Sequence, residues 1–362
     1  MITGNKGEWS EIYVLLKLLA EGKLYAADEE LNRIEDTYFP IIKIIRQESK
    51  EHINEYKTGE KVKIYVDGVE KISMDALVFD DEAEHLLGEL MSSKKKSAFE
   101  VERTEHFMNS IECYKVSAPS THKADILMQI HDTNTGIMPE VGFSIKSELG
   151  NPPTLLNAGK TTNFTYEIIS HRDGIVSDTN SIYRVVNGKD HVDVKKRIAN
   201  LIKDNGSLEY YDMDNEVFKN NLILIDSCMD NIIAQTLLYF YRDGITNCKD
   251  MVKRLEEENP LKYGNINAYA YKFKKFLASV ALGMKPATEW NGIDEANGGY
   301  IIVTKEGDVV AYHIYNRNCF EEYLLNNTKY ETASTSRHGF GEAYTEGYKQ
   351  FIKLNLQIRF IK

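Results

Sequence analysis

The sequence predicts an α/β (α+β) fold: a mixed β-sheet flanked by helices, with an additional region of helices and β-hairpins. Two observations lead to this class. Up to about position 190, segments with a side-chain period of two alternate with segments of helical spacing. From about position 192, helical patterns dominate until a hairpin and a terminal strand close the chain. We therefore expect a core at 1–190 and a second region at 191–362, with a weakly marked boundary between them.

The bulk composition is typical of a globular protein. Of the 362 residues, 42% are hydrophobic, and the formal net charge is −11. That charge taken alone disfavours a nucleic-acid partner, although the local field of a cleft decides binding and not the total. The chain has no apolar run long enough to span a membrane, no secretory signal and no CxxC pair among its four cysteines, so we expect a cytoplasmic protein with reduced thiols.

The elements of the N-terminal half follow from apolar spacing. Helices are expected at 9–21, 26–35, 80–91 and 99–111, and strands at 39–45, 124–130 and 141–146. Gly22 is expected to end the first helix. The segments 61–66 and 69–72 are expected to form a hairpin, because the Asp67-Gly68 pair between them suits a tight primed turn. Residues 151–160 include two prolines and are expected to form a loop.

The C-terminal half is expected to be mainly helical. Helices are predicted at 192–202, 229–241, 249–258 and 268–282, a hairpin at 300–304 and 309–315, and a terminal strand at 351–360. The terminal strand has an apolar face and a polar face. The apolar face carries Ile352, Leu354, Leu356, Ile358 and Phe360, and the polar face carries Lys353, Asn355, Gln357 and Arg359.

Two central strands are expected to place an acid beside an amine. Side chains alternate along a strand, so the apolar residues of 124–130 share one face and Asp125 lies on the other. In 141–146, Ser144 and Lys146 share the face opposite the apolar residues. The residues at 132–136 suit a turn between the two strands. The resulting hairpin would hold Asp125 next to Lys146 on one side of a sheet.

An acid beside a lysine suits phosphodiester hydrolysis. A divalent cation lowers the pKa of a bound water and neutralises charge on the phosphate. Mg²⁺ prefers oxygen ligands and keeps several waters, so Asp125 is the expected principal ligand. Lys146 would orient the water or stabilise charge in the transition state. The alternative is an ordinary solvated sheet face, on which single Asp and Lys residues are common.

Short motifs at both ends and at the centre of the chain are similar to those of a known protein family. They read KGEWSE at 6–11, GFSIKS at 142–147, PTLLNA at 153–158, TNF at 162–164, SRH at 336–338 and KLNLQIRF at 353–360. Together they resemble the HpaII family of type II restriction endonucleases, within the PD-(D/E)xK superfamily. The resemblance implies a PD-(D/E)xK restriction-endonuclease-like core, Mg²⁺ as cofactor, and cleavage of both strands of double-stranded DNA at CCGG to leave 5′-phosphates.

The sequence departs from the superfamily motif at two positions. Ala124 replaces the proline before Asp125, and Ser144 replaces the acid two residues before Lys146. Some restriction enzymes with a CCGG core target have the same Ser-x-Lys pattern and take the missing carboxylate from a nearby helix. By this resemblance, Glu167 is our candidate for the additional metal ligand. Glu148 ranks lower. Glu11 is another candidate, because glutamates on the first helix of this fold often face the metal; its alternative is a solvated helix residue, as for Glu8.

Two polar segments are the expected DNA contacts. In the loop at 332–340, Arg337 is the first candidate for guanine contact and His338 the second, with Ser334 and Ser336 beside them. A second segment follows the catalytic strand and carries Lys160, Thr161 and Asn163, which suit the phosphate backbone. The alternative for both segments is a surface loop whose polar groups cap local structure.

Other chemistries have little support in the sequence. It contains no HExxH zinc pattern, no GxGxxG before a helix, no GxxxxGK[ST] and no GxSxG elbow. The leading hypothesis is a type II restriction endonuclease in a prokaryotic cytoplasm with access to the nucleoid, acting in phage defence. Homodimerisation would match a palindromic site, and a cognate DNA methyltransferase would protect the host. The alternative, suggested by Ser144, is a non-catalytic DNA-binding or regulatory protein that retains the nuclease fold.

Overall fold

The chain forms two compact units. The computed structural model describes residues 2–361 except 29–30, 50–51, 96, 118–123, 134, 171–182, 187–188, 266 and 314–316. The first unit comprises Met1–Pro153 and Asp294–Phe320 with Lys362, and the second comprises Thr154–Ile293 and Glu321–Ile361. The chain therefore leaves the first unit near residue 153 and returns to it, which differs from the single division near residue 190 that the sequence suggested.

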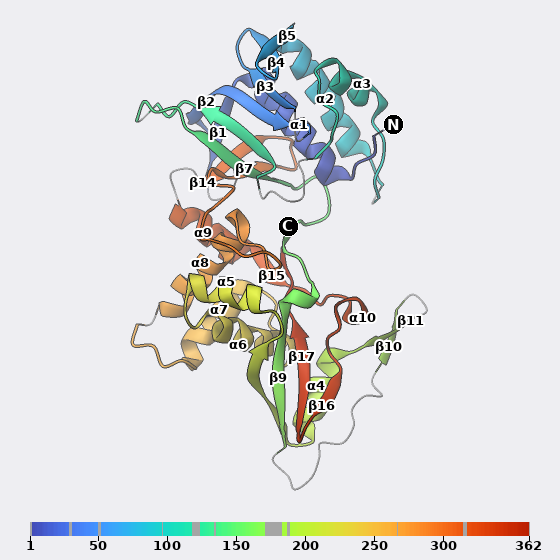
Figure 1. Ribbon diagram of the computed structural model, residues 1–362, viewed down its shortest axis with the longest axis vertical. Coiled ribbons are helices and arrows are strands. Elements are labelled where there is room, and N and C mark those ends of the chain that lie inside the picture. The colour runs from blue at the N-terminus through green and yellow to red at the C-terminus, as the bar shows by residue number, and fades with distance from the viewer. Residues whose placement is uncertain are drawn as a thin grey trace. The chain divides into compact units, whose positions relative to one another are not determined.

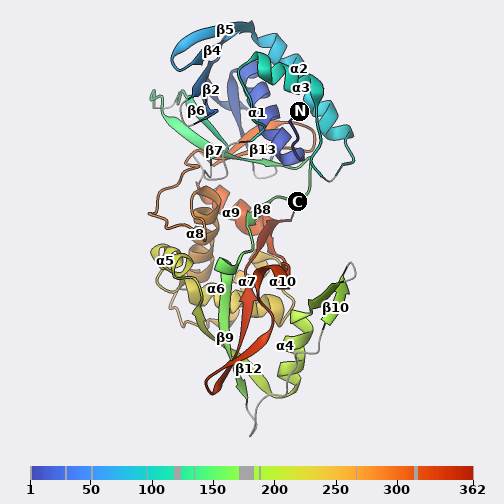
Figure 2. The same cartoon turned by 45° about the vertical axis from the view of Figure 1, so that its right-hand side comes forward.

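The first unit is built on one large mixed sheet with three helices (Figures 1 and 2). Its helices are α1 (Lys6–Glu21), α2 (Ala76–Ser92) and α3 (Glu102–Ser110). Its strands are β1 (Lys23–Ala27), β2 (Arg33–Gln47), β3 (Ile53–Lys57), β4 (Lys61–Val66), β5 (Val69–Asp75), β6 (Ile126–Ile130), β7 (Glu140–Ser147), β13 (Gly299–Val303) and β14 (Val309–His313).

The nine strands pair in the order β1-β14-β13-β7-β6-β2-β3-β4-β5. β13 lies parallel to β7, and β14 lies parallel to β1, whereas the hairpins β6–β7, β4–β5 and β13–β14 are antiparallel. The long strand β2 also pairs with β1 through its first half, so the pairings close on themselves. All three hairpins are confirmed, and at the β4–β5 turn Asp67 and Gly68 both have positive φ, as a primed turn requires.

Helix α1 lies at the centre of the first unit's core. Its N-terminus is closed by a capping box between Asn5 and Glu8, and Gly22 ends it with φ of 63°. Nine of its residues are buried against apolar residues of the sheet and of α2. The expected helix and its end at Gly22 are therefore confirmed. The Glu8 carboxylate caps the helix, because it accepts a hydrogen bond from the backbone N–H of Asn5.

One predicted helix of the N-terminal half is wrong. Among the described residues of 26–35, those at 26–27 end β1 and those at 33–35 begin β2, and none is helical. The reason is non-local: Tyr25 and Ala26 pair with Val310 and Ala311 of β14, which lies near the other end of the chain. Pairing with a buried strand outweighs the weak helical preference of this segment.

The second unit contains a group of helices and three small sheets (Figures 1 and 2). Its helices are α4 (Val194–Lys203), α5 (Glu216–Ile225), α6 (Met229–Tyr241), α7 (Cys248–Glu258), α8 (Ala268–Leu282) and α10 (Thr335–His338), with η1 (Lys160–Thr162); α9 (Arg317–Asn327) begins in the first unit. Its strands are β8 (Thr154–Leu156), β9 (Asn163–Ser170), β10 (Tyr183–Val186), β11 (Lys189–Val192), β12 (Gly206–Met213), β15 (Thr328–Tyr330), β16 (Ala343–Glu346), β17 (Lys349–Asn355) and β18 (Ile358–Phe360).

The C-terminal predictions are mostly confirmed, with two corrections. The expected loop at 151–160 contains β8 and the start of η1. The expected terminal strand is two strands, because β17 belongs to the four-stranded sheet β12-β9-β17-β16 and β18 to the sheet β15-β18-β8. All five apolar residues of that segment are buried, as expected, but Asn355 on the polar face is only 1% exposed and therefore does not face water.

No single described helix has the length and apolar composition needed to cross a membrane. The pair α5 and α6 meets that criterion together, across a bend of 106°.

Candidate functional site

The β6–β7 hairpin brings Asp125, Ser144 and Lys146 together in the first unit. Asp125 directly precedes β6, and its backbone N–H donates to the carbonyl of Phe143 at 2.8 Å. Its carboxylate oxygen Oδ2 accepts from Ser144 Oγ at 2.9 Å and from the backbone N–H of Ile145 at 2.6 Å. Lys146 Nζ lies 4.0 Å from the same oxygen. The acid and the amine therefore share one side of the sheet, as the side-chain alternation predicted.

Ser144 connects the two charged groups. Lys146 Nζ donates to Ser144 Oγ at 2.7 Å, and that hydroxyl donates to Asp125. Lys146 also donates to the carbonyl of Ile145 at 3.1 Å and lies 5.1 Å from the centre of the Tyr300 ring on β13. An ammonium has three N–H donors, so this arrangement leaves one N–H for a water or a phosphate oxygen.

The hairpin separates an apolar face from the face that carries the charged pair. Phe143 and Ile145 of β7 point into the core with α1, and Ser147 on the same face accepts a bond from Ser10 of α1 at 2.8 Å. The charged pair lies on the other face. The Asp125 and Lys146 side chains are 24% and 21% exposed, whereas Ser144 is 3% exposed. The pair can therefore reach a ligand, while the hydroxyl between them is sealed.

A cavity of about 400 Å³ opens beside Asp125 within the first unit. Its lining includes Lys115 and Glu295, which are exposed, and Arg46, which is half-buried. The Arg46 guanidinium is held by Glu48 at 3.2 Å and by the carbonyl of Lys115 at 2.8 Å. Of the cationic groups in the lining, Arg46 is therefore already paired, and Lys115 is the exposed one near the carboxylate.

Glu295 is a lining residue that the sequence analysis missed. It precedes β13, and its backbone is brought close by Gly142 of β7. A Cβ added to Gly142 would lie 2.5 Å from the Glu295 carbonyl oxygen and 2.8 Å from the Cβ of Ala124. Only glycine permits that approach. No local pattern could have revealed Glu295, because it lies far along the chain from Asp125 and joins the site through the β7–β13 pairing.

The residues around Asp125 fit a divalent cation that keeps most of its water ligands better than one bound entirely by protein side chains. Both hydrogen bonds to the carboxylate go to Oδ2, and no described residue bonds to Oδ1, which leaves that oxygen for a ligand. Across the described parts of the chain, no three His, Cys, Asp or Glu side chains gather as a metal cage. Mg²⁺ is held by one or two carboxylates and keeps several waters, so the residues present fit Mg²⁺.

The other candidate acids occupy different places. Glu11 is half-buried on α1 beside Ser10, and Glu148 directly follows β7, where its backbone N–H donates to Val303. Glu167 lies on strand β9 of the second unit and not on a helix, and its carboxylate pairs with Lys349 at 2.8 Å. The interactions of Glu167 are thus those of a cross-strand ion pair in a sheet, which gives no sign of a metal site.

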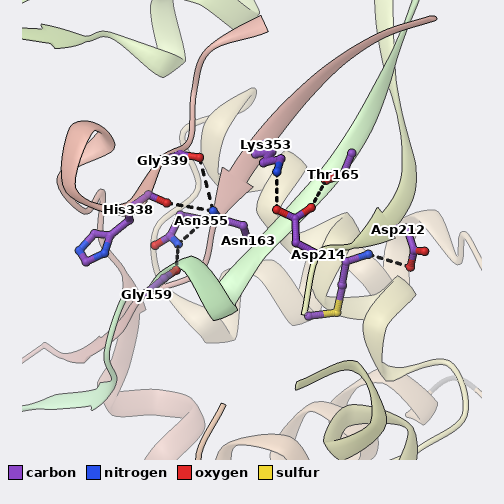
Figure 3. A network of polar contacts seen from close by, with 10 residues as sticks. Gly159, Asn163, Thr165, Asp212, Asp214, His338, Gly339, Lys353 and Asn355 are labelled. Carbon is purple, nitrogen blue, oxygen red and sulfur yellow. Dashed lines mark hydrogen bonds and ion pairs between the residues drawn. The ribbon is translucent and has the colours of Figure 1, made fainter. Parts of the chain in front are cut away.

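The second unit brings together the two polar segments expected to contact DNA (Figure 3). Ser336, Arg337 and His338 lie on α10, a single helical turn, and Lys160 and Thr161 lie on η1. Asn163 joins the two turns, because its amide nitrogen donates to the His338 carbonyl at 2.9 Å. Asn163 itself is only 2% exposed and its amide bonds within the protein, so the structure gives no sign of the direct DNA contact that was predicted for it.

The side chains on these turns remain available for a ligand. Ser336, Arg337 and Lys160 are exposed, and Ser334, Thr161 and His338 are half-buried. Burial lowers the pKa of His338, and the positive charge of Arg337 lowers it further. A neutral imidazole is one donor and one acceptor, which suits contact with a base edge.

Comparison with known proteins agrees with these features. Residues 5–360 match the family model described as HpaII restriction endonuclease. The chain is 40% identical over 363 residues to the type II restriction enzyme HpaII of Haemophilus parainfluenzae, and the match covers 99% of both chains. No solved structure is significantly similar.

Proposed function

The chain belongs to the HpaII restriction endonuclease family, and on this premise we propose that it cleaves both strands of DNA at CCGG with Mg²⁺, leaving 5′-phosphates. Family membership makes it a type II site-specific endonuclease that binds double-stranded DNA. The alternative of a non-catalytic regulatory protein loses its support. We further propose that the first unit has a PD-(D/E)xK core.

One observation carries the catalytic proposal: the chain of hydrogen bonds from Lys146 through Ser144 to Asp125. In this chain Ser144 occupies the position of the missing acid. A hydroxyl is a poor ligand for Mg²⁺, but it can accept from an ammonium and donate to a carboxylate at once. Ser144 therefore acts as a spacer that keeps the cation of Lys146 and the anion of Asp125 apart and oriented.

The residues of the site divide the reaction between them. When bound, Mg²⁺ would lower the pKa of a water and offset charge on the phosphate. Asp125 would hold it through Oδ1, since Oδ2 is fixed by Ser144 and Ile145. Lys146 has one N–H left after its bonds to Ser144 and Ile145, and that donor orients the attacking water or contacts a phosphate oxygen. Glu11 remains a proposed second carboxylate.

Base reading is proposed for the second unit. Arg337 is exposed on α10 and presents the fork of donors that guanine O6 and N7 accept. Half-buried His338 follows it, and Lys160 and Thr161 on η1 suit the phosphate backbone. A homodimer would match the symmetry of a palindromic site. A methyltransferase acting on the same site, in a prokaryotic cytoplasm, would complete the restriction-modification system.

The test is cleavage of a plasmid that carries CCGG, with Mg²⁺ and then with EDTA. We expect discrete fragments only with Mg²⁺. The variant Lys146→Ala should lose about 10²- to 10³-fold in single-turnover rate, since it removes a preorganised cation at the phosphate. It should still bind the same duplex when Ca²⁺ replaces Mg²⁺.

The matched control is Lys71→Ala, because Lys71 is an exposed lysine on β5 of the same sheet. It should cleave at the rate of the unaltered protein. Cleavage by Lys146→Ala at more than about a tenth of that rate would remove Lys146 from the mechanism.

A further inference from the structure

Two buried asparagines face each other at the end of a strand pair in the second unit. Asn163 begins β9 and Asn355 ends β17, and the two are direct partners in the antiparallel register. They are 2% and 1% exposed. The amide nitrogen of Asn355 donates to Asn163 Oδ1 at 2.7 Å. The two buried side chains therefore form one connected polar unit.

Each asparagine holds one of the two polar turns (Figure 3). Asn355 Nδ2 donates to the carbonyl of Gly159 at 2.8 Å and approaches Thr162 Oγ1 at 3.1 Å, which fixes the two ends of η1. Asn163 Nδ2 donates to the carbonyl of His338 at 2.9 Å and lies 3.5 Å from that of Gly339, which fixes the end of α10. Backbone bonds from Leu356 to Thr162 and from Gly341 to Lys353 also hold these segments, and the two asparagine side chains add the link between the turns.

A third buried side chain completes the support of α10. Arg197 of α4 is fully buried, and its guanidinium donates to the carbonyl of Gly341. Gly339 and Gly341 both have positive φ, so the chain turns sharply at each of them. The carbonyls of His338, Gly339 and Gly341 are therefore held by two buried side chains, while Ser336 and Arg337 on the same turn stay exposed.

The Asn355 side chain uses its donors and leaves its acceptor without a partner among the described residues. Asn355 Oδ1 is buried and accepts no hydrogen bond from any residue that the structure describes. A buried polar atom left without a partner is unfavourable, and such atoms call for another explanation. Here the amide is oriented so that its donors serve Gly159 and Asn163.

We propose that the cross-strand pair Asn163–Asn355 positions the turn that carries Arg337 against the turn that carries Lys160 and Thr161, and so determines how well the enzyme distinguishes its site from near matches. The inference rests on the proposed reading of DNA by these turns. Asn163 and Asn355 are positioning residues, because both are buried and act through exposed neighbours. Holding contact groups in place before binding lowers the cost of ordering them.

The key variant is Asn163→Asp, which keeps the size of the side chain and its acceptor for Asn355. It replaces the donor to His338 by an oxygen that repels the carbonyl when ionised. Burial raises the pKa of such a carboxyl, and the protonated form can donate again. Binding is measured by fluorescence anisotropy with Ca²⁺, using one duplex with CCGG and one with a single substituted base pair.

We expect Asn163→Asp to lose about tenfold in discrimination between the two duplexes at pH 8 and to regain most of it at pH 6. The matched control is Asn220→Asp, which puts the same charge on an exposed position of α5. It should keep full discrimination, and measuring it at pH 8 and at pH 6 accounts for any effect of protonating His338. Should Asn163→Asp fail to unfold cooperatively, Asn355→Ser tests the same link and should lose discrimination in the same direction.

A double variant separates this inference from the proposed function. If Asn163 acts through the turn that carries Arg337, adding Asn163→Asp to Arg337→Ala causes no further loss of discrimination. The inference would be overturned if the losses of discrimination of the two single variants add in the double variant. It would also be overturned if Asn163→Asp discriminates fully at both pH values. Full discrimination by Arg337→Ala alone would instead contradict Arg337 as the base reader.

Discussion

Replacing Ser144 with alanine removes the hydroxyl that links the charged pair and leaves both charges in place. Asp125 loses its 2.9 Å bond and keeps the 2.6 Å bond from Ile145, while Lys146 loses its 2.7 Å bond and keeps the one to the Ile145 carbonyl. A hydrogen bond to a charged group contributes about 1.5–3 kcal/mol. Both charged side chains reach solvent, so water replaces part of this, and we expect a loss of stability of about 1–2 kcal/mol.

The effect of Ser144→Ala on activity should be intermediate. Without the Ser144 hydroxyl, Lys146 is free to approach Asp125 directly. Its remaining N–H is then no longer held toward the attacking water or the phosphate oxygen. Misorientation of one catalytic group without its removal predicts a rate about 10- to 100-fold below that of the unaltered enzyme. Single-turnover cleavage of a short CCGG duplex and urea unfolding measure the two effects separately.

Ser73→Ala is the matched control, because Ser73 is exposed on β5 of the same sheet. It should change neither quantity. The spacer role is refuted if Ser144→Ala is as inactive as Lys146→Ala, since the hydroxyl would then take part in the chemistry. It is equally refuted if Ser144→Ala cleaves at the full rate.

Three further outcomes follow from the geometry. Gly142→Ala should lower stability by about 1–3 kcal/mol in urea unfolding and impair cleavage, because the new Cβ meets the Glu295 carbonyl and Ala124; an unchanged midpoint would show that the segment before β13 shifts freely. Arg337→Ala should raise the pKa of His338 toward its ordinary value in an NMR titration, because the charge of Arg337 lowers that pKa. Since folding lowers the pKa of His338, the unfolded state binds the proton more readily, and the free energy of unfolding should fall as the pH drops below about 6.5. Glu167→Gln should leave the cleavage rate and its Mg²⁺ dependence unchanged, because Glu167 pairs with Lys349; a shifted Mg²⁺ midpoint would restore Glu167 as a ligand.

The local parts of the fold and site could be predicted from the sequence. Period-two alternation was enough to place Asp125 and Lys146 on one side of a hairpin, because the pleat of a strand fixes side-chain direction. Helix α1 followed from its apolar stripe and from Gly22. Turn chemistry gave the β4–β5 hairpin through Asp67-Gly68.

What could not be predicted depends on contacts between distant parts of the chain. The first unit takes β13 and β14 from beyond residue 294, and although the sequence predicted that they pair with each other, nothing in it indicates their pairing with β7 and β1. A helix was predicted at 26–35, across the end of β1 and the start of β2, for that reason, and Glu295 was missed. Asn163 and Asn355 were read as exposed polar residues, because alternation gives the face of a strand but not what covers that face.

The return of the chain to the first unit affects when the nuclease becomes complete during synthesis. The first segment of the second unit ends at Ile293. A nascent chain of that length already contains Asp125, Ser144 and Lys146. It still lacks Glu295 and β13, the strand that pairs with β7. Until then β7 has an open edge with unpaired backbone groups. A chain that ends before β13 would therefore lack both a strand of the central sheet and part of the lining of the proposed catalytic site.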